Sequence, residues 1–428
     1  MNLSWGQIAR LGLVQMALGA VVVLTTSTLN RLMVVEFALP ALLPGALVGL
    51  HYGIQLSRPR WGYTSDTGGN RTRWIIGGMS ILAAGGIGAA FAVTLFAQSF
   101  MAAIILSIAS YALIGIGVGA SGTSLLALLA TATAPNRRAA AATITWLMMI
   151  FGIAVTAGLS GQFLDPYSPQ RLMTVVTVIA AIAVLLTTIA IGRIESRVTP
   201  MKPEAPTPFI QGMQEIWAEE KTRNFTIFVF LSMNAYFMQE LILEPYAGLV
   251  FGFTPGQSTT LSGAQNGGVF IGMLTVGIMA TGLKIGALRT WVMVGCLGSC
   301  AVLTLICMTG FAYTALNFIY LVVALGFFNG MFAVAAIGAM MALASEGRGQ
   351  REGTRMGLWG AAQAIAAGFG GLTGAVLVDI ARNFAPDGPA FGTVFAFEAL
   401  LFLAAAMMSA RVMETPQAIM PATMVPGE

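Results

Sequence analysis

Charged residues are scarce in this chain. Only 9% of its 428 residues are charged, whereas 57% are hydrophobic, and the mean hydropathy is +0.82. This composition excludes an ordinary soluble protein, and repeated apolar runs of 18 or more residues predict a polytopic helical membrane protein. The pI near 9.1 does not indicate nucleic-acid binding, because the basic residues lie in loops beside the apolar runs.

Several signatures of catalysis and nucleotide binding are missing as well. The absence of a Walker A sequence excludes an ATP-driven pump, and neither H-E-x-x-H nor C-x-x-C occurs. The three cysteines fall in one apolar segment, too few for a disulfide or zinc framework. The four aspartates, at positions 66, 165, 379 and 387, cannot form the paired aspartate-rich motifs with which membrane prenyltransferases hold magnesium diphosphate.

Twelve apolar segments predict an all-α fold with twelve transmembrane helices. Their approximate ranges are 9–29, 33–54, 74–97, 101–130, 141–163, 172–193, 224–250, 258–282, 290–311, 315–344, 356–381 and 391–412. We expect an N-terminal six-helix half at 1–193, a linker at 194–223, a C-terminal six-helix half at 224–412 and a tail at 413–428. The linker is rich in proline and then reads "FIQGMQEIWAEEK", whose apolar spacing predicts an amphipathic helix on the membrane surface.

The basic residues predict the orientation of these helices. Eighteen of the twenty-one lysines and arginines fall in the loops on the side of the termini, and only Arg31, Arg171 and Arg382 fall on the other side. By the positive-inside rule, both termini are expected in the cytoplasm.

The two halves carry matching positions. Trp146 and Trp359 are 213 residues apart, and Asp165 and Asp379, which close the same two spans, are 214 apart. A constant offset favours an ancient duplication whose halves are related by an axis along the membrane normal. The alternative is a chance alignment of two helices rich in glycine and alanine.

The loop after the second span reads "GYTSDTGGNRTRW". It resembles the loop motif of the major facilitator superfamily, and Gly62, Asp66, Gly69 and Arg71 fall on the positions of that motif. Glycines permit a tight turn between spans, and an aspartate near a helix end can cap amides or hold a cation between the halves. The alternative interpretation is a short basic turn without a special role.

Ionisable residues inside spans are candidates for function, because a charge in hydrocarbon is costly. Glu240 and Glu244 lie four residues apart on one helical face of span seven, before Pro245, which we expect to kink or end the helix. Glu36, at the start of span two, and Arg31 are expected nearby. Together they predict a polar mouth where the halves meet, and the alternative is a set of ion pairs that stabilise helix ends.

His51 is the only histidine. A neutral imidazole can ligate the magnesium of a chlorin or relay a proton, although a lone histidine near a helix end is more often simply interfacial.

Four segments resemble the PucC/LhaA-like bacteriochlorophyll delivery family of the major facilitator superfamily. They are "TLNRLMVVEFALPA", "QELILEPYAGLVFG", "NGMFAVAAIGAMMALA" and "GLWGAAQAIAAGFGG". The short second loop differs from that of the light-harvesting assembly members and favours the branch described as a bacteriochlorophyll synthase chain.

The resemblance implies a membrane accessory protein in bacteriochlorophyll biosynthesis, pigment delivery and photosynthetic complex assembly. Bacteriochlorophyll or its precursor is then the expected cargo, with no covalent cofactor. Expected partners are membrane lipid, bacteriochlorophyll synthase or other pigment enzymes, and light-harvesting or reaction-centre subunits. The expected location is the cytoplasmic or the intracytoplasmic photosynthetic membrane. A proton-coupled small-molecule transporter and a non-catalytic subunit of a synthase complex remain the alternatives.

Overall fold

The computed structural model of the protein describes residues 3–58, 61, 70–134, 137–195, 217–283, 285–312, 318–346 and 352–412. The expected amphipathic helix of the linker, up to residue 216, and the tail from residue 413 lie outside these ranges. The N-terminal half comprises α1 (Trp5–Val23), η1 (Leu24–Thr28), α2 (Leu29–Arg31), η2 (Leu32–Glu36), α3 (Leu42–Gln55), α5 (Arg71–Leu95), α6 (Phe100–Ala132), α7 (Arg138–Leu164) and α8 (Pro169–Ile191). The C-terminal half comprises α10 (Glu220–Phe251), α11 (Pro255–Val276), η5 (Gly277–Gly282), α12 (Leu288–Ala312), α13 (Phe318–Glu346), α14 (Glu352–Arg382) and α15 (Asp387–Val412).

These elements correspond to the twelve expected segments, with one helix shorter than expected. In the described part of the chain, eleven helical segments are long and apolar enough to cross a membrane, and the continuous segment from α1 to η2 counts as one of them. The twelfth span is α3, whose 14 residues cover about 21 Å, less than the roughly 30 Å of a bilayer core.

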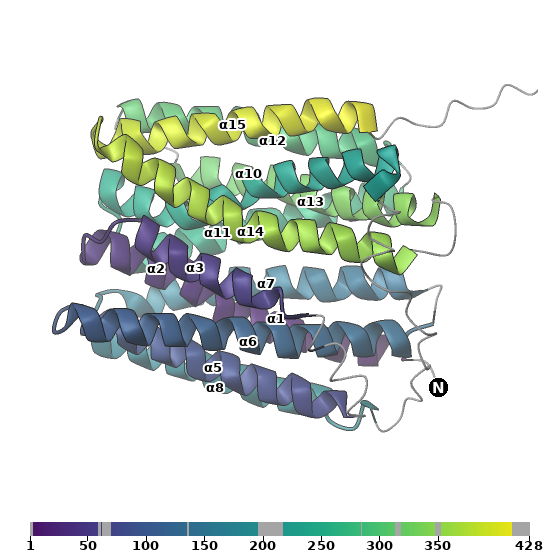
Figure 1. Cartoon of the computed structure of the whole chain (residues 1–428), viewed down its shortest axis with the longest axis horizontal. Helices are drawn as coiled ribbons and strands as arrows, with labels where there is room; N and C mark the ends of the chain where they lie inside the picture. Colours follow the sequence, from purple (N-terminus) through teal and green to yellow (C-terminus); the bar gives the residue numbers. More distant parts are fainter. Residues whose placement is uncertain are drawn as a thin grey trace, which may run out of the picture.

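The helices run side by side in two groups (Figure 1). Each group buries its own apolar core, one formed mainly by α10 to α15 and the other mainly by α1 to α8. The groups meet most extensively through two helix pairs, α3 with α14 and α7 with α11, and the end of the first span also contacts α10 and α11. Glycines make the second contact close: a Cβ on Gly161 would lie 2.5 Å from the carbonyl oxygen of Gly256.

The boundary between the first two spans differs from the sequence prediction. We expected a break near residues 30–32, because Asn30 and Arg31 are polar, but the helical segment continues to Glu36. Both side chains are buried, so their polarity marks a contact with the other half and not a loop. The turn lies at residues 37–41, where Ala38 has a φ of 49° and Pro40 follows.

Pro245 does not end its helix, which was one of the two expected effects of this proline. α10 continues through Pro245 to Phe251 and closes on Gly252 in the left-handed conformation. The reason lies in the contact between the halves described next.

Candidate functional site: a polar contact between the two halves

Hydroxyl groups of the first span contact the C-terminal half. We call the end of the bundle opposite the N-terminus in Figure 1 the far end. Near this end the first span adopts the π-helical turn η1. The Ser27 hydroxyl donates to Glu244 and lies 2.9 Å from the Ser262 hydroxyl. The Thr28 and Thr259 hydroxyls are 3.0 Å apart. All of these side chains are buried, so they hold the two halves together in a dry environment.

Asn30 explains why Pro245 is tolerated within α10. A proline has no N–H, so the carbonyl of Leu241, four residues earlier, loses its ordinary helical donor. The Asn30 side-chain amide donates to that carbonyl across 2.6 Å. The N-terminal half therefore supplies the hydrogen bond that the C-terminal half lacks.

Arg31 and Glu36 form an ion pair at the end of the first span. The Arg31 side chain is only 2% exposed, whereas that of Glu36 is 37% exposed. Arg31 Nη2 also donates to the carbonyl oxygen of Phe253 at 2.6 Å, and Arg31 interacts electrostatically with Glu244. The guanidinium thus links both halves, although Glu36 belongs to the end of the first span and not to the start of the second.

Glu240 and Glu244 lie on the face of α10 that the first span covers. Glu244 is buried, and its Oε2 atom has no hydrogen-bond partner among the described residues. Glu240 is partly exposed and interacts with Thr26, Tyr236 and Tyr52. Two carboxyl groups one turn apart, with an arginine beside one of them, can exchange a proton or bind a polar group.

Two aspartates cap helices of the opposite half. Asp165 follows α7 and accepts from the Thr254 hydroxyl (2.7 Å) and the Gly256 amide (3.2 Å) at the start of α11. Asp379 of α14 accepts from the amides of Ala41 (2.9 Å) and Leu42 (2.6 Å) at the start of α3. The two contacts are reciprocal, as a duplicated unit predicts, and each places a carboxylate at the positive end of a helix.

His51 lies apart from these acids, within α3. It is buried, and its Nε2 is 2.8 Å from Nε2 of Gln55, whose Oε1 accepts from Arg58. The Gln55 amide therefore donates to His51 Nε2, which leaves the ring proton on Nδ1. Because this contact occupies the Nε2 lone pair, that atom cannot ligate magnesium in the conformation described.

The loop motif is described only at its last position. Gly62, Asp66 and Gly69 lie outside the described residues. Arg71 begins α5, and its amide and that of Thr72 each donate to the Glu195 carboxylate at 2.8 Å. Glu195 thus caps α5 from the end of the N-terminal half.

Sequence reasoning missed the hydroxyls, Asn30 and the roles of the two aspartates. The run "TTSTLNR" at residues 25–31 carried a signal, because seven residues in an apolar span include five polar uncharged ones and an arginine. Such a run inside a span indicates a helix that packs against polar groups of protein.

Solved structures share the overall fold of the chain. The crystal structure of the peptide transporter POT in complex with sulfate superposes with a TM-score of 0.70 at 14% identity, over 96% of each chain. A bacterial homologue of the human lysosomal transporter Spinster gives a TM-score of 0.64 at 15% identity, over 96% of this chain and 95% of that one. The protein therefore has the major facilitator superfamily fold, as expected.

Sequence comparison identifies the family. The family model of the PUCC protein matches residues 28–416, and the chain belongs to this family. A Rhodobacter capsulatus protein named "Bacteriochlorophyll synthase 44.5 kDa chain" is 63% identical over the full length of both chains. The "Protein PucC" of Cereibacter sphaeroides is 29% identical over 93% of this chain and 90% of its own. The expected family is thereby confirmed.

Proposed function

We propose that this integral membrane protein is an accessory factor of bacteriochlorophyll biosynthesis, which receives pigment and passes it on during photosynthetic complex assembly. The observation that supports this function best is the full-length similarity to the Rhodobacter capsulatus synthase chain. Bacteriochlorophyll or its precursor is the cargo, and a pigment synthase or a light-harvesting or reaction-centre subunit is the protein partner.

The aspartates support an accessory role over a catalytic one. Asp165 and Asp379 bind helix amides, and Asp387 pairs with Arg382 at 2.7 Å. These three of the four aspartates are engaged with protein groups, at positions separated along the chain. They are not arranged as a paired site for magnesium diphosphate.

A deletion strain tests the accessory role. We expect lower bacteriochlorophyll and photosystem levels, while membranes of the strain still convert bacteriochlorophyllide and prenyl diphosphate to bacteriochlorophyll. The purified chain alone should give no turnover with the same two substrates. Robust turnover by the purified chain, or normal pigment levels in the deletion strain, would contradict the proposal.

The orientation with both termini in the cytoplasm is part of the proposal, and the membrane is then the cytoplasmic or intracytoplasmic photosynthetic membrane. Its support is the excess of basic residues in the loops on the side of the termini. Reporter fusions after Tyr167 and Gly347 should report opposite sides of the membrane. Two fusions that report the same side would refute this topology.

A proton-coupled transporter is the second candidate. It is favoured by Glu240 and Glu244, which lie inside the membrane where the halves meet and form with Arg31 and Glu36 the proposed polar mouth. Proteoliposomes that enclose a pH indicator test it: bacteriochlorophyllide added outside should acidify the lumen. An unchanged lumen pH in the presence of measured bacteriochlorophyllide uptake would exclude proton coupling.

A further inference from the structure

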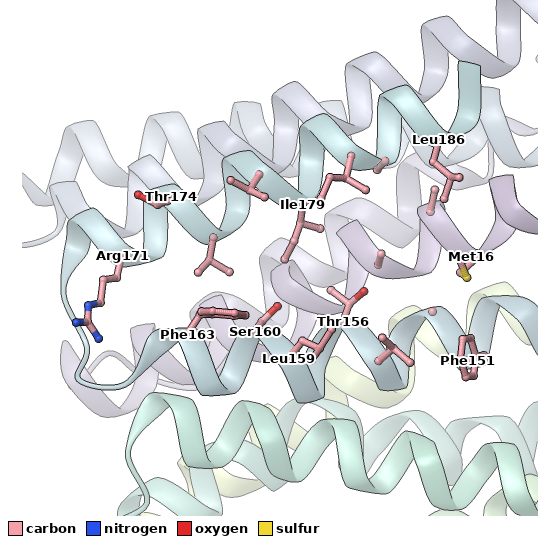
Figure 2. Close-up of a pocket in the computed structure, with 18 of the residues that line it drawn as sticks. Met16, Phe151, Thr156, Leu159, Ser160, Phe163, Arg171, Thr174, Ile179 and Leu186 are labelled. Carbon is pink, nitrogen blue, oxygen red and sulfur yellow. The ribbon is translucent and has the colours of Figure 1, made fainter. Parts of the chain in front are cut away.

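An apolar groove with a volume of about 690 Å³ opens on the outer side of the N-terminal half (Figure 2). It lies between α7 and α8, which are consecutive in the sequence and both pack on α1 but contact each other little. Two small residues of its floor, Ala17 and Ala20, leave the space open, and Gly152 lets α7 approach Met16 of α1 closely. From Phe151 to Phe163 the α7 wall spans about 18 Å, so the groove is a long slot.

The rim of the groove faces the hydrocarbon of the membrane. Phe163 is 67% exposed and Ile182 is 56% exposed, and both lie on membrane-spanning helices. An apolar slot that opens sideways to lipid admits a hydrophobic molecule directly from the bilayer. It does not require passage through the contact between the halves, which is closed at the far end by buried polar contacts.

Polar groups mark one end of the slot. The Ser160 side chain is 2% exposed, and its hydroxyl has no hydrogen-bond partner within the described structure. It points across the groove toward α8 (Figure 2). At the same end, the exposed Arg171 donates one N–H to the Asp165 carbonyl at 2.6 Å, and its guanidinium has further donors. A buried hydroxyl without a partner favours a ligand that brings its own acceptor.

We propose that this groove binds the esterified hydrocarbon tail of bacteriochlorophyll. The Ser160 hydroxyl donates to the ester carbonyl, the tail lies along the slot toward Met16 and Leu186, and the macrocycle remains outside near Arg171. This inference rests on the proposed function and names its pigment site. The lining residues include no imidazole, thiolate or carboxylate to ligate magnesium, so the slot is assigned to the tail alone.

A single slot with one buried hydroxyl fits one ester-linked chain. A phospholipid carries two chains, and its second chain would remain in the bilayer. The experiment below therefore treats phospholipid as the competing occupant.

Pigment binding to the purified full-length protein in nanodiscs tests the site. Thr156→Trp fills the slot from α7, and Ser160→Ala removes only the hydroxyl. Thr304→Trp, on the exposed side of α12, is the matched control. With bacteriochlorophyll as the probe, we expect Thr156→Trp to weaken binding at least about tenfold and Ser160→Ala about two- to tenfold. Thr304→Trp should bind as the original chain does, and bacteriochlorophyllide, which lacks the tail, should not compete.

Three results would overturn the groove site. Unchanged pigment affinity in Thr156→Trp places the pigment elsewhere. Loss of co-purified phospholipid from Thr156→Trp without loss of pigment binding makes the groove a lipid site. Absence of any pigment binding to the original chain also excludes it. The proposed function is judged separately, by the pigment level of the deletion strain.

Discussion

The hydrogen bond from Asn30 to the Leu241 carbonyl predicts a specific rescue between the two halves. Asn30→Leu keeps a side chain of similar shape but leaves the buried carbonyl without a donor, which costs about 1–3 kcal/mol. Pro245→Ala restores an N–H four residues after Leu241, so the helix can satisfy the carbonyl itself. The loss caused by Asn30→Leu should therefore fall by more than half in the Pro245→Ala background, a coupling of roughly 1 kcal/mol or more.

Thermal midpoints of the four purified proteins, measured at one scan rate in one detergent, provide the assay. Asn266→Leu is the control, because the Asn266 amide donates to the carbonyl of Ser262, four residues earlier in the same helix. That carbonyl can still accept the backbone N–H of residue 266, so the control should cost less than Asn30→Leu. If Asn30→Leu lowers the midpoint equally with and without Pro245, the explanation of the tolerated proline is wrong.

Two further predictions concern the carboxylates. Asp165→Ala and Asp379→Ala should each lower the thermal midpoint, since each removes a helix cap worth about 1 kcal/mol. Asp387→Ala should change the midpoint little, because its ion pair with Arg382 is partly exposed. Equal effects of all three substitutions would refute the claim that the first two aspartates stabilise the contact between the halves. At equal membrane levels, Glu244→Gln should reduce pigment accumulation in cells more than Glu398→Gln. Glu244→Gln replaces a carboxyl group that accepts a hydrogen bond from Ser27 and lies beside Arg31, whereas both oxygens of buried Glu398 in α15 lack a partner in the part of the chain described. The reverse order would place the functional site elsewhere.

The number and type of spans could be predicted from the sequence, because long apolar runs have few alternatives in a membrane protein. The first turn could not be placed, since Asn30 and Arg31 have the composition of a loop. Only the tertiary contact of Asn30 with Leu241 and of Arg31 with Phe253 shows that they are buried. That the helix continues through Pro245 could not be predicted for the same reason: the donor that replaces the missing N–H lies 215 residues earlier in the chain.

The candidate site was predicted in part. Acids and an arginine in apolar spans stand out by the cost of burying a charge, so these residues could be singled out, but which acid pairs with Arg31 could not be predicted. The partners of Asp165 and Asp379 are mostly backbone amides, which every sequence position offers, and no pattern distinguishes them. The groove could not be predicted from the sequence either, because it depends on how far α7 and α8 separate over α1 and not on any residue type.

The π-helical turn at Leu24–Thr28 shifts the angular positions of the side chains within the first span. Its closing bond joins the Leu29 amide to the Leu24 carbonyl, so one residue more than in an α-helical turn is accommodated there. Adjacent residues Ser27 and Thr28 can consequently both reach the C-terminal half. Deletion of one residue within this turn would restore α-helical spacing, so the helices on either side would keep their relative orientation, but adjacent hydroxyls would no longer both face the C-terminal half. A family alignment should therefore tolerate substitutions among these hydroxyl residues more readily than a gap.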